Sequence, residues 1–327
     1  MKPAQNKNAI KKSALINPKK ENSFSVYLII AFCFPVLLYL QTVNYGFTYF
    51  DDNGIIAENI NFLKHFSNAF HAFLINTSAF YRPMQTVSYM IDIQLSGAKS
   101  TWMFHLSNVL LLGLIATSLF ILLRRLSIPP KLALTGALIY SVHPLFVSAI
   151  AWIPARGDMQ LTLFSLLAFI FFIDFLQKGK LKYMFLNWAA FTIALFCKET
   201  AAFLPFLFII YLFTIHKGKR FEKKYLYNAL LYGVSGIIWF WMRTKAIGDF
   251  SDHDAVFGLT AFLASLRVIP ESLAKFFLPF FNEPNPGFSV FKTLAGIVII
   301  VLIVIVFFKN KQRLKKELLF CLCCLSR

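Results

Sequence analysis

Long apolar runs separated by short polar segments recur along this chain. A membrane-spanning helix needs about 20 mostly apolar residues, because only a helix satisfies its own backbone inside hydrocarbon. Runs that meet or approach this length are Phe24–Val43, His105–Leu123, Leu132–Trp152, Gln160–Leu176, Tyr183–Cys197, Ala201–Ile215, Leu226–Met242 and Ser289–Phe308. Tyr183–Cys197 is short and needs flanking residues to span. The pattern predicts an all-α membrane protein, a helical bundle of about eight spans.

Basic and acidic residues lie at opposite ends of these apolar runs. Most basic residues lie in clusters at 2–20, 124–131, 178–182, 217–224 and 309–316, and most acidic residues lie at the opposite ends. Because cytoplasmic loops carry an excess of Lys and Arg, we expect the N-terminus to be cytoplasmic. The expected organisation is a cytoplasmic basic tail (1–22), a transmembrane domain (23–316) and a truncated or frameshifted end (317–327). The first run lacks a small-x-small cleavage site, so we expect it to stay as an anchor.

Two long loops, 44–104 and 243–288, fall on the outer side in this topology. In the first, phenylalanines three or four residues apart predict an amphipathic helix lying in the membrane interface: Phe62, Phe66, Phe70 and Phe73. In the second, residues 259–281 are either another interfacial helix or a poor span. We favour the interfacial helix, because a span there would place the 309–316 cluster outside.

Composition agrees with a membrane location. Hydrophobic residues make up 58% of the 327 residues and charged residues 15%, with a mean hydropathy of +0.64. A soluble domain has about 45–50% apolar and about 25% charged residues. These values exclude a soluble enzyme, a disordered tail and a disulfide-linked secreted module. The net charge of +18 would suggest nucleic acid in a soluble protein, but basic clusters flanking apolar runs indicate membrane lipids, and we expect no nucleic-acid partner.

Ionisable side chains gather at the outer ends of the predicted spans. Carboxylates there can act as a general base or a metal ligand, and Arg and Lys suit a phosphate. The residues are Asp51, Asp52, Arg82, Asp92, His105, His143, Arg156, Asp158, Lys198 and Glu199, with Asn108 one turn after His105. Each also has an ordinary interpretation: a solvated turn for Asp51–Asp52, headgroup contacts for Arg82 and Lys198, a carbonyl partner for His143, a local ion pair for Arg156–Asp158. Together they predict a cavity at the outer face.

Six short motifs carry a resemblance to a known family. In chain order they are Tyr49-Phe50-Asp51-Asp52, Tyr81-Arg82-Pro83, His105-Leu106-Ser107-Asn108, Val142-His143-Pro144, Ala151-Trp152 with Arg156-Gly157-Asp158, and Lys198-Glu199. With them the chain resembles the GT-C class of membrane glycosyltransferases. It is most similar to the N-terminal part of the transmembrane-and-TPR protein O-mannosyltransferases and of the dolichyl-phosphate-mannose-protein mannosyltransferases. The order of Ala155 and Gly157 departs from the family's commoner form, and no helical-repeat pattern follows.

The resemblance implies roles for these residues. Asp51 would be the base and Asp52 its catalytic partner; Arg82, Arg156, Asp158, Lys198 and Glu199 would bind the donor phosphate; His105, Asn108 and His143 would shape the site. The implied activity is transfer of a mannose-like hexose from a polyprenyl-phosphate sugar to a hydroxyl of a protein at the extracytoplasmic face. No cofactor is certain, and a divalent metal stays open. The alternatives are a lipid or surface-glycan acceptor, and an inactive fragment or non-catalytic membrane protein.

Overall fold

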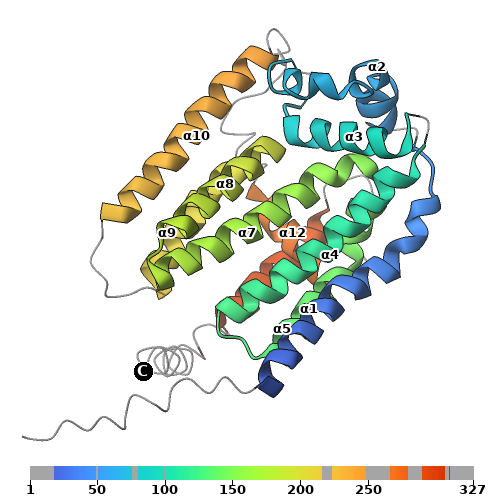
Figure 1. The fold of residues 1–327 in the computed structure, drawn as a ribbon. Helices are drawn as coiled ribbons and strands as arrows, with labels where there is room; N and C mark the ends of the chain where they lie inside the picture. The colour runs from blue at the N-terminus through green and yellow to red at the C-terminus, as the bar shows by residue number, and fades with distance from the viewer. Residues whose placement is uncertain are drawn as a thin grey trace, which may run out of the picture.

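A computed structural model describes residues 18–48, 51–75, 80–98, 100–215, 223–247, 266–278, 289–305 and 309, and over these ranges the chain is helical with no strand. Long helices lie side by side along a common direction (Figure 1). They are α1 (Pro18–Tyr39), α4 (Trp102–Arg125), α5 (Pro130–Val142), α7 (Arg156–Lys178), α8 (Leu181–Cys197), α9 (Leu204–Ile215) and α10 (Lys223–Ile247). Two further helices, α2 (Ile60–Leu63) and α3 (Pro83–Ser96), lie across one end of this bundle (Figure 1).

The structure supports an all-α membrane protein and does not confirm the predicted eight spans. Among the described residues, three helical segments are long and apolar enough to cross a membrane: Phe24–Asn44, Trp102–Arg125 and Ile153–Lys178. Apolar helices over Leu181–Cys197, Glu199–Phe213 and Val290–Ile305 are shorter than a span. The predicted basic tail lies mostly outside the described residues, and the predicted end at 317–327 lies wholly outside them.

The predicted span Leu132–Trp152 is broken in the middle. It consists of α5 and of a second helical piece, Pro144–Ala151, bent by 50° and ending in α6 (Val147–Ala151); the two pieces together can form a fourth span. His143, at the break, has an extended backbone with ψ of 126°. Pro144 explains the break, because proline has no N–H to donate and disfavours the helical conformation of the residue before it.

The first outer loop does not form the predicted amphipathic helix. It folds instead into short turns: a turn at Asn53–Ala57, then α2, then turns at Phe66–Ala69 and His71–Phe73. The Asn68 side-chain amide donates to the Phe62 carbonyl at 3.0 Å, which closes the chain on itself between these turns. Leu63 and Ala72 are buried in a cluster with Tyr89 of α3, so tertiary packing decides the shape of this loop.

The second outer loop is described only in part. It contributes α12 (Val268–Phe277), whose Glu271 side chain accepts from the Thr293 hydroxyl at 2.9 Å on the Val290–Ile305 helix. Residues 248–265 and 279–288 lie outside the described ranges, so the interfacial position of 259–281 stays a prediction.

The largest core cluster lies where α7 packs on α8, with α9 and α10 against them. It is rich in aromatic rings, including Phe172, Phe191 and Phe208. A buried polar group crosses this core: the Asn187 amide donates to the Ala168 carbonyl at 2.8 Å, and the Asn228 amide donates to Asn187 at 3.0 Å. Such interhelical hydrogen bonds hold membrane helices together where the hydrophobic effect between them is weak.

Candidate functional site

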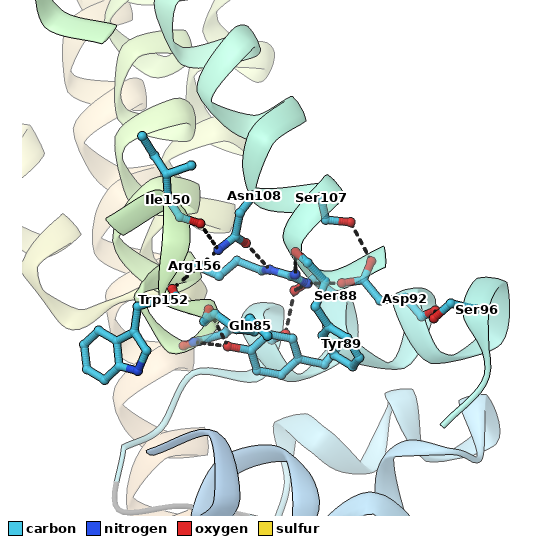
Figure 2. A network of polar contacts seen from close by, with 12 residues as sticks. Gln85, Ser88, Tyr89, Asp92, Ser96, Ser107, Asn108, Ile150, Trp152 and Arg156 are labelled. Atoms are coloured by element: carbon cyan, nitrogen blue, oxygen red, sulfur yellow. Dashed lines mark hydrogen bonds and ion pairs between the residues drawn. The ribbon is translucent and has the colours of Figure 1, made fainter. Parts of the chain in front are cut away.

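Arg156 begins α7 and lies at the centre of a buried polar network (Figure 2). Its side chain is 0% exposed and ion-paired with Asp92 of α3. Its Nε donates to the Asn108 Oδ1 at 2.8 Å, and its other nitrogens donate to the Ser88 hydroxyl at 3.3 Å and to the Phe104 carbonyl at 2.6 Å. One guanidinium therefore joins α3, α4 and α7.

Asp92 and Asn108 are themselves held on their other side. The Ser107 hydroxyl donates to the second oxygen of Asp92 at 2.6 Å. The Asn108 amide donates to the carbonyls of Ile150 and Trp152, at 3.3 and 3.5 Å, in the segment that leads into α7 (Figure 2). Because every charged member has a partner of opposite charge or a hydrogen bond, the network avoids the cost of a lone buried charge.

Two α3 side chains extend the network to the turn before α7. The Gln85 amide donates to the Pro154 carbonyl at 2.7 Å and the Tyr89 hydroxyl donates to the Ile153 carbonyl at 3.2 Å. Burial raises the pKa of Tyr89 to about 12, so its phenol stays a neutral donor. A Cβ at Gly157 would lie 2.7 Å from the Gln85 Oε1, so a larger residue there would displace the Gln85 amide that bonds the Pro154 carbonyl.

Two basic side chains lie at the same end of α7 and are more open than Arg156. Lys198, which follows α8, pairs with Asp158 at 2.5 Å, and their side chains are 20% and 51% exposed. Arg82 is partly buried; its Cδ lies 3.6 Å from the position of a Cβ on Gly157, and its guanidinium lies over the Phe80 ring at 4.5 Å. Lys198 therefore lies at the first turn of α7, and the Arg82 side chain passes beside the same turn.

A cavity of about 340 Å³ lies between α4, α5, α6 and α7 and has Asp158 in its lining. Its lining is mostly apolar: Leu112, Ile115, Tyr140, Leu145, Phe146, Ala149, Ile150, Asp158, Met159 and Thr162. This volume is within the range of small-molecule sites, about 300–1,000 Å³. A mostly apolar cavity with one carboxylate in its lining, itself paired with Lys198, suits a ligand that is mostly apolar and carries one charged group.

The acidic pair of the first outer loop is divided between solvent and interior. Asp51 is exposed, whereas Asp52 is 1% exposed. The Asp52 Oδ2 accepts from the Thr48 N–H at 2.5 Å and from the Thr48 hydroxyl at 2.9 Å. His105, at the start of α4, is equally buried and lies close enough to the Asp52 carboxylate to feel its charge.

The structure therefore brings predicted residues together in two groups and leaves others apart. Arg156 binds Asn108, and Asp158 pairs with Lys198. His143 is elsewhere: its Nε2 lies 2.7 Å from the Phe276 carbonyl and its ring stacks on Phe276, which ties α12 to the break after α5. Glu199 lies exposed in the turn before α9.

Sequence reasoning noted Asp92 without giving it a role and missed its neighbours on α3. Polar residues at intervals of three or four along α3 mark the face that meets α4, α7 and the turn before α7: Gln85, Ser88 and Asp92. That periodicity was available in the sequence. As for a metal, no group of three or more His, Cys, Asp or Glu side chains that could hold an ion occurs among the described residues.

Comparisons with known proteins agree with this architecture. Residues 83–241, just under half of the chain, match the family described as dolichyl-phosphate-mannose-protein mannosyltransferase. Protein O-mannosyl-transferase Tmtc2 of Drosophila melanogaster is 27% identical over 197 residues, which are 56% of this chain and 21% of that protein. Protein O-mannosyl-transferase TMTC2 of Homo sapiens is 31% identical over 146 residues, 42% of this chain and 17% of that protein. Protein O-mannosyl-transferase TMTC4 of Homo sapiens is 31% identical over 103 residues, 28% of this chain and 14% of that protein.

The matched part of the chain is similar to membrane mannosyltransferases. This similarity to the protein O-mannosyltransferases agrees with the resemblance that the sequence motifs carry. The aligned region spans about a fifth or less of the length of these curated relatives. No solved structure matches the chain significantly.

Proposed function

We propose that the chain is the transmembrane part of a glycosyltransferase that moves a mannose-like hexose from a polyprenyl-phosphate donor to a protein hydroxyl at the extracytoplasmic face. The observation that carries this proposal is that Lys198 pairs with Asp158, which lines a mostly apolar cavity, while the Arg82 side chain passes Gly157 in the same turn of α7. The cavity would hold the start of the lipid chain, and the cations would hold the phosphate.

The donor phosphate gains negative charge as its bond to the sugar breaks. Cations and N–H groups aimed at that charge stabilise the transition state more than the ground state. Lys198 can serve in this way by exchanging its partner Asp158 for the phosphate, since their ion pair is partly exposed and such pairs contribute only about 0–1 kcal/mol. Arg82 supplies a planar guanidinium, which suits a phosphate.

Arg156 has a different role in this proposal. Its guanidinium is fully buried, and its nitrogens are already bound to Asp92, Asn108, Ser88 and the Phe104 carbonyl. We therefore infer that Arg156 positions the start of α7, and with it the cation pair, and that its direct contact with the donor is the weaker interpretation.

The acceptor side is assigned to the acidic pair. Asp51 is exposed, so an incoming hydroxyl can reach its carboxylate, and a carboxylate at that place can remove the hydroxyl proton as the sugar is transferred. Asp52 is anchored by Thr48 and holds the turn that carries Asp51.

Transfer of labelled mannose from a polyprenyl-phosphate donor, measured on membranes containing the full chain, tests these assignments. Lys198→Met and Arg82→Met are each expected to lower turnover about 10²-fold, the usual effect of removing one donor to a developing anion. Asp51→Asn is expected to lower it by a similar factor or more. Lys182→Met, on the first turn of α8 at the opposite end of that helix from Lys198, is the matched control and should leave turnover unchanged. Full activity of Asp51→Asn would refute the assignment of Asp51 as the base. Full activity of both cation variants would refute the assignment of Arg82 and Lys198 to the phosphate site.

A further inference from the structure

A buried carboxylate holds two cations at the far end of α7 from Arg156. Asp174, one turn before the end of α7, is 3% exposed. Its Oδ1 lies 2.9 Å from the Nε of Arg125, the last residue of α4, and 3.1 Å from the Nζ of Lys178, the last residue of α7. The Arg125 Nη2 also donates to the Asp174 Oδ2 at 3.2 Å. One carboxylate therefore fixes an arginine and a lysine side by side.

Both cations keep donors that the described part of the chain does not use. Arg125 directs Nε and Nη2 to Asp174, and its Nη1 makes no hydrogen bond within the described residues. Lys178 directs one N–H to Asp174 and one to the Tyr183 hydroxyl at 3.2 Å, which leaves one of its three N–H groups for another acceptor. The two side chains are 37% and 38% exposed, so a ligand can reach these donors.

Arg125 and Lys178 are close enough to bind one anion together. Because the Arg125 Nε and the Lys178 Nζ both lie against the same Asp174 oxygen, they are at most 6.0 Å apart. Each N–H···O bond spans about 2.7–3.2 Å, so one phosphate group with its several oxygens can accept from both side chains. Two positive charges face one carboxylate, which leaves one positive charge for the anion to neutralise. Arginine and lysine are both suited to a phosphate.

The position along α7 places these cations at the depth of lipid headgroups. α7 belongs to the candidate span Ile153–Lys178 and, at 1.5 Å per residue, is about 33 Å long. The hydrocarbon layer is about 30 Å thick, so the two ends of α7 lie at the two membrane surfaces. In the predicted topology the Lys178 end is cytoplasmic, and the cytoplasmic leaflet carries anionic phospholipids. Leu186, three residues after Tyr183 on α8, is 43% exposed and offers apolar surface to an acyl chain.

We propose that Arg125 and Lys178, held by Asp174, bind the phosphate of an anionic phospholipid in the cytoplasmic leaflet. A bound lipid would join the ends of α4, α7 and α8 and stabilise their packing. The site lies at the opposite end of α7 from Lys198 and Asp158, so it is separate from the proposed donor site and does not depend on sugar transfer.

Thermal unfolding of the full chain in detergent micelles tests this site. The probes are phosphatidylglycerol, phosphatidylcholine and inorganic phosphate, each titrated separately, and the rise in unfolding temperature with concentration gives an apparent affinity. We expect phosphatidylglycerol to stabilise the unchanged protein and the other two to have little effect. Lys178→Met and Arg125→Gln should each lower the affinity for phosphatidylglycerol about fivefold, the usual contribution of one cation at an anionic lipid surface. Each variant leaves Asp174 one cationic partner, so the carboxylate is not left unpaired and the chain should fold.

Lys180→Met is the matched control for these variants. Lys180 is exposed in the same turn between α7 and α8 and is not paired with Asp174, so its loss removes one positive charge without touching the site. The affinity for phosphatidylglycerol should then stay nearly unchanged. An equal loss in Lys180→Met would indicate attraction by diffuse surface charge and would overturn the proposal. Unchanged affinity in both Lys178→Met and Arg125→Gln, or equal stabilisation by phosphatidylcholine or by inorganic phosphate, would also overturn it.

Discussion

Asp92→Asn is the substitution that most directly tests the buried network. The side chain is 3% exposed and ion-paired with Arg156, which is 0% exposed. Replacement by asparagine keeps the shape and one oxygen for the Ser107 hydroxyl, but leaves the guanidinium buried without its counter-charge. Arginine cannot lose its proton in compensation.

Asp92→Asn, although it exchanges a single atom group, is expected to lower the free energy of unfolding strongly. Removing one partner of a buried ion pair costs about 3–5 kcal/mol, and the retained oxygen places this variant near the lower limit, about 3 kcal/mol. At about 1–2 °C per kcal/mol for a chain of 327 residues, the unfolding temperature should fall by about 3–6 °C. The matched control is Asp158→Asn, which breaks an ion pair that is half exposed on the acidic side and should cost about 0–1 kcal/mol.

Thermal unfolding of the detergent-solubilised protein measures both variants under one condition. The double variant Asp92→Asn with Arg156→Met removes both charges and should be more stable than the sum of the single effects predicts. If Asp92→Asn lowers the unfolding temperature no more than Asp158→Asn, Arg156 is not held as described, and its direct role in binding donor phosphate regains support.

Three further substitutions test other parts of the fold. Gly157→Ala should lower the unfolding temperature because its Cβ would meet Gln85 at 2.7 Å, at about 1–3 kcal/mol, whereas Gly233→Ala, with open space around it, should not. Asn187→Leu should cost about 0.6–2 kcal/mol by breaking the polar contacts between α7, α8 and α10, and an unchanged unfolding temperature would contradict that role. His143→Phe should speed hydrogen exchange of the α12 amides, because the bond to the Phe276 carbonyl is lost; unchanged exchange would mean that other contacts hold α12.

Apolar run length was the strongest signal in the sequence. It predicted helices over α1, α4 and α7 because a bilayer requires about 20 apolar residues and a helical backbone. The same signal predicted one unbroken helix through His143 and Pro144, since hydropathy does not register the missing N–H of proline. The phenylalanine spacing in the first outer loop also failed, because packing of Leu63 and Ala72 against α3 outweighed the local helical period.

The sequence supplies candidate residues for the site and not their contacts. Charge at a span end shows that Arg156 and Lys198 are unusual, but both interpretations, lipid contact and ligand contact, fit a sequence equally well. The structure distinguishes the two interpretations by the partner of each side chain. Arg156 is buried against Asp92, 64 positions away in the sequence, whereas Lys198 pairs with Asp158, 40 positions away, and this pair is partly exposed. Pairings at such separations depend on how α3, α4, α7 and α8 pack, which no local pattern encodes.

The central claim is sugar transfer from a lipid phosphate to a hydroxyl of a protein. Membranes containing the chain would be incubated with polyprenyl-phosphate-[³H]mannose, and the product would be separated into protein, lipid and polysaccharide. The account predicts label on protein that mild alkali releases by β-elimination, and loss of that label with Asp51→Asn. Label confined to lipid or polysaccharide would contradict the acceptor assignment, and no Asp51-dependent label in any fraction would contradict the transferase itself.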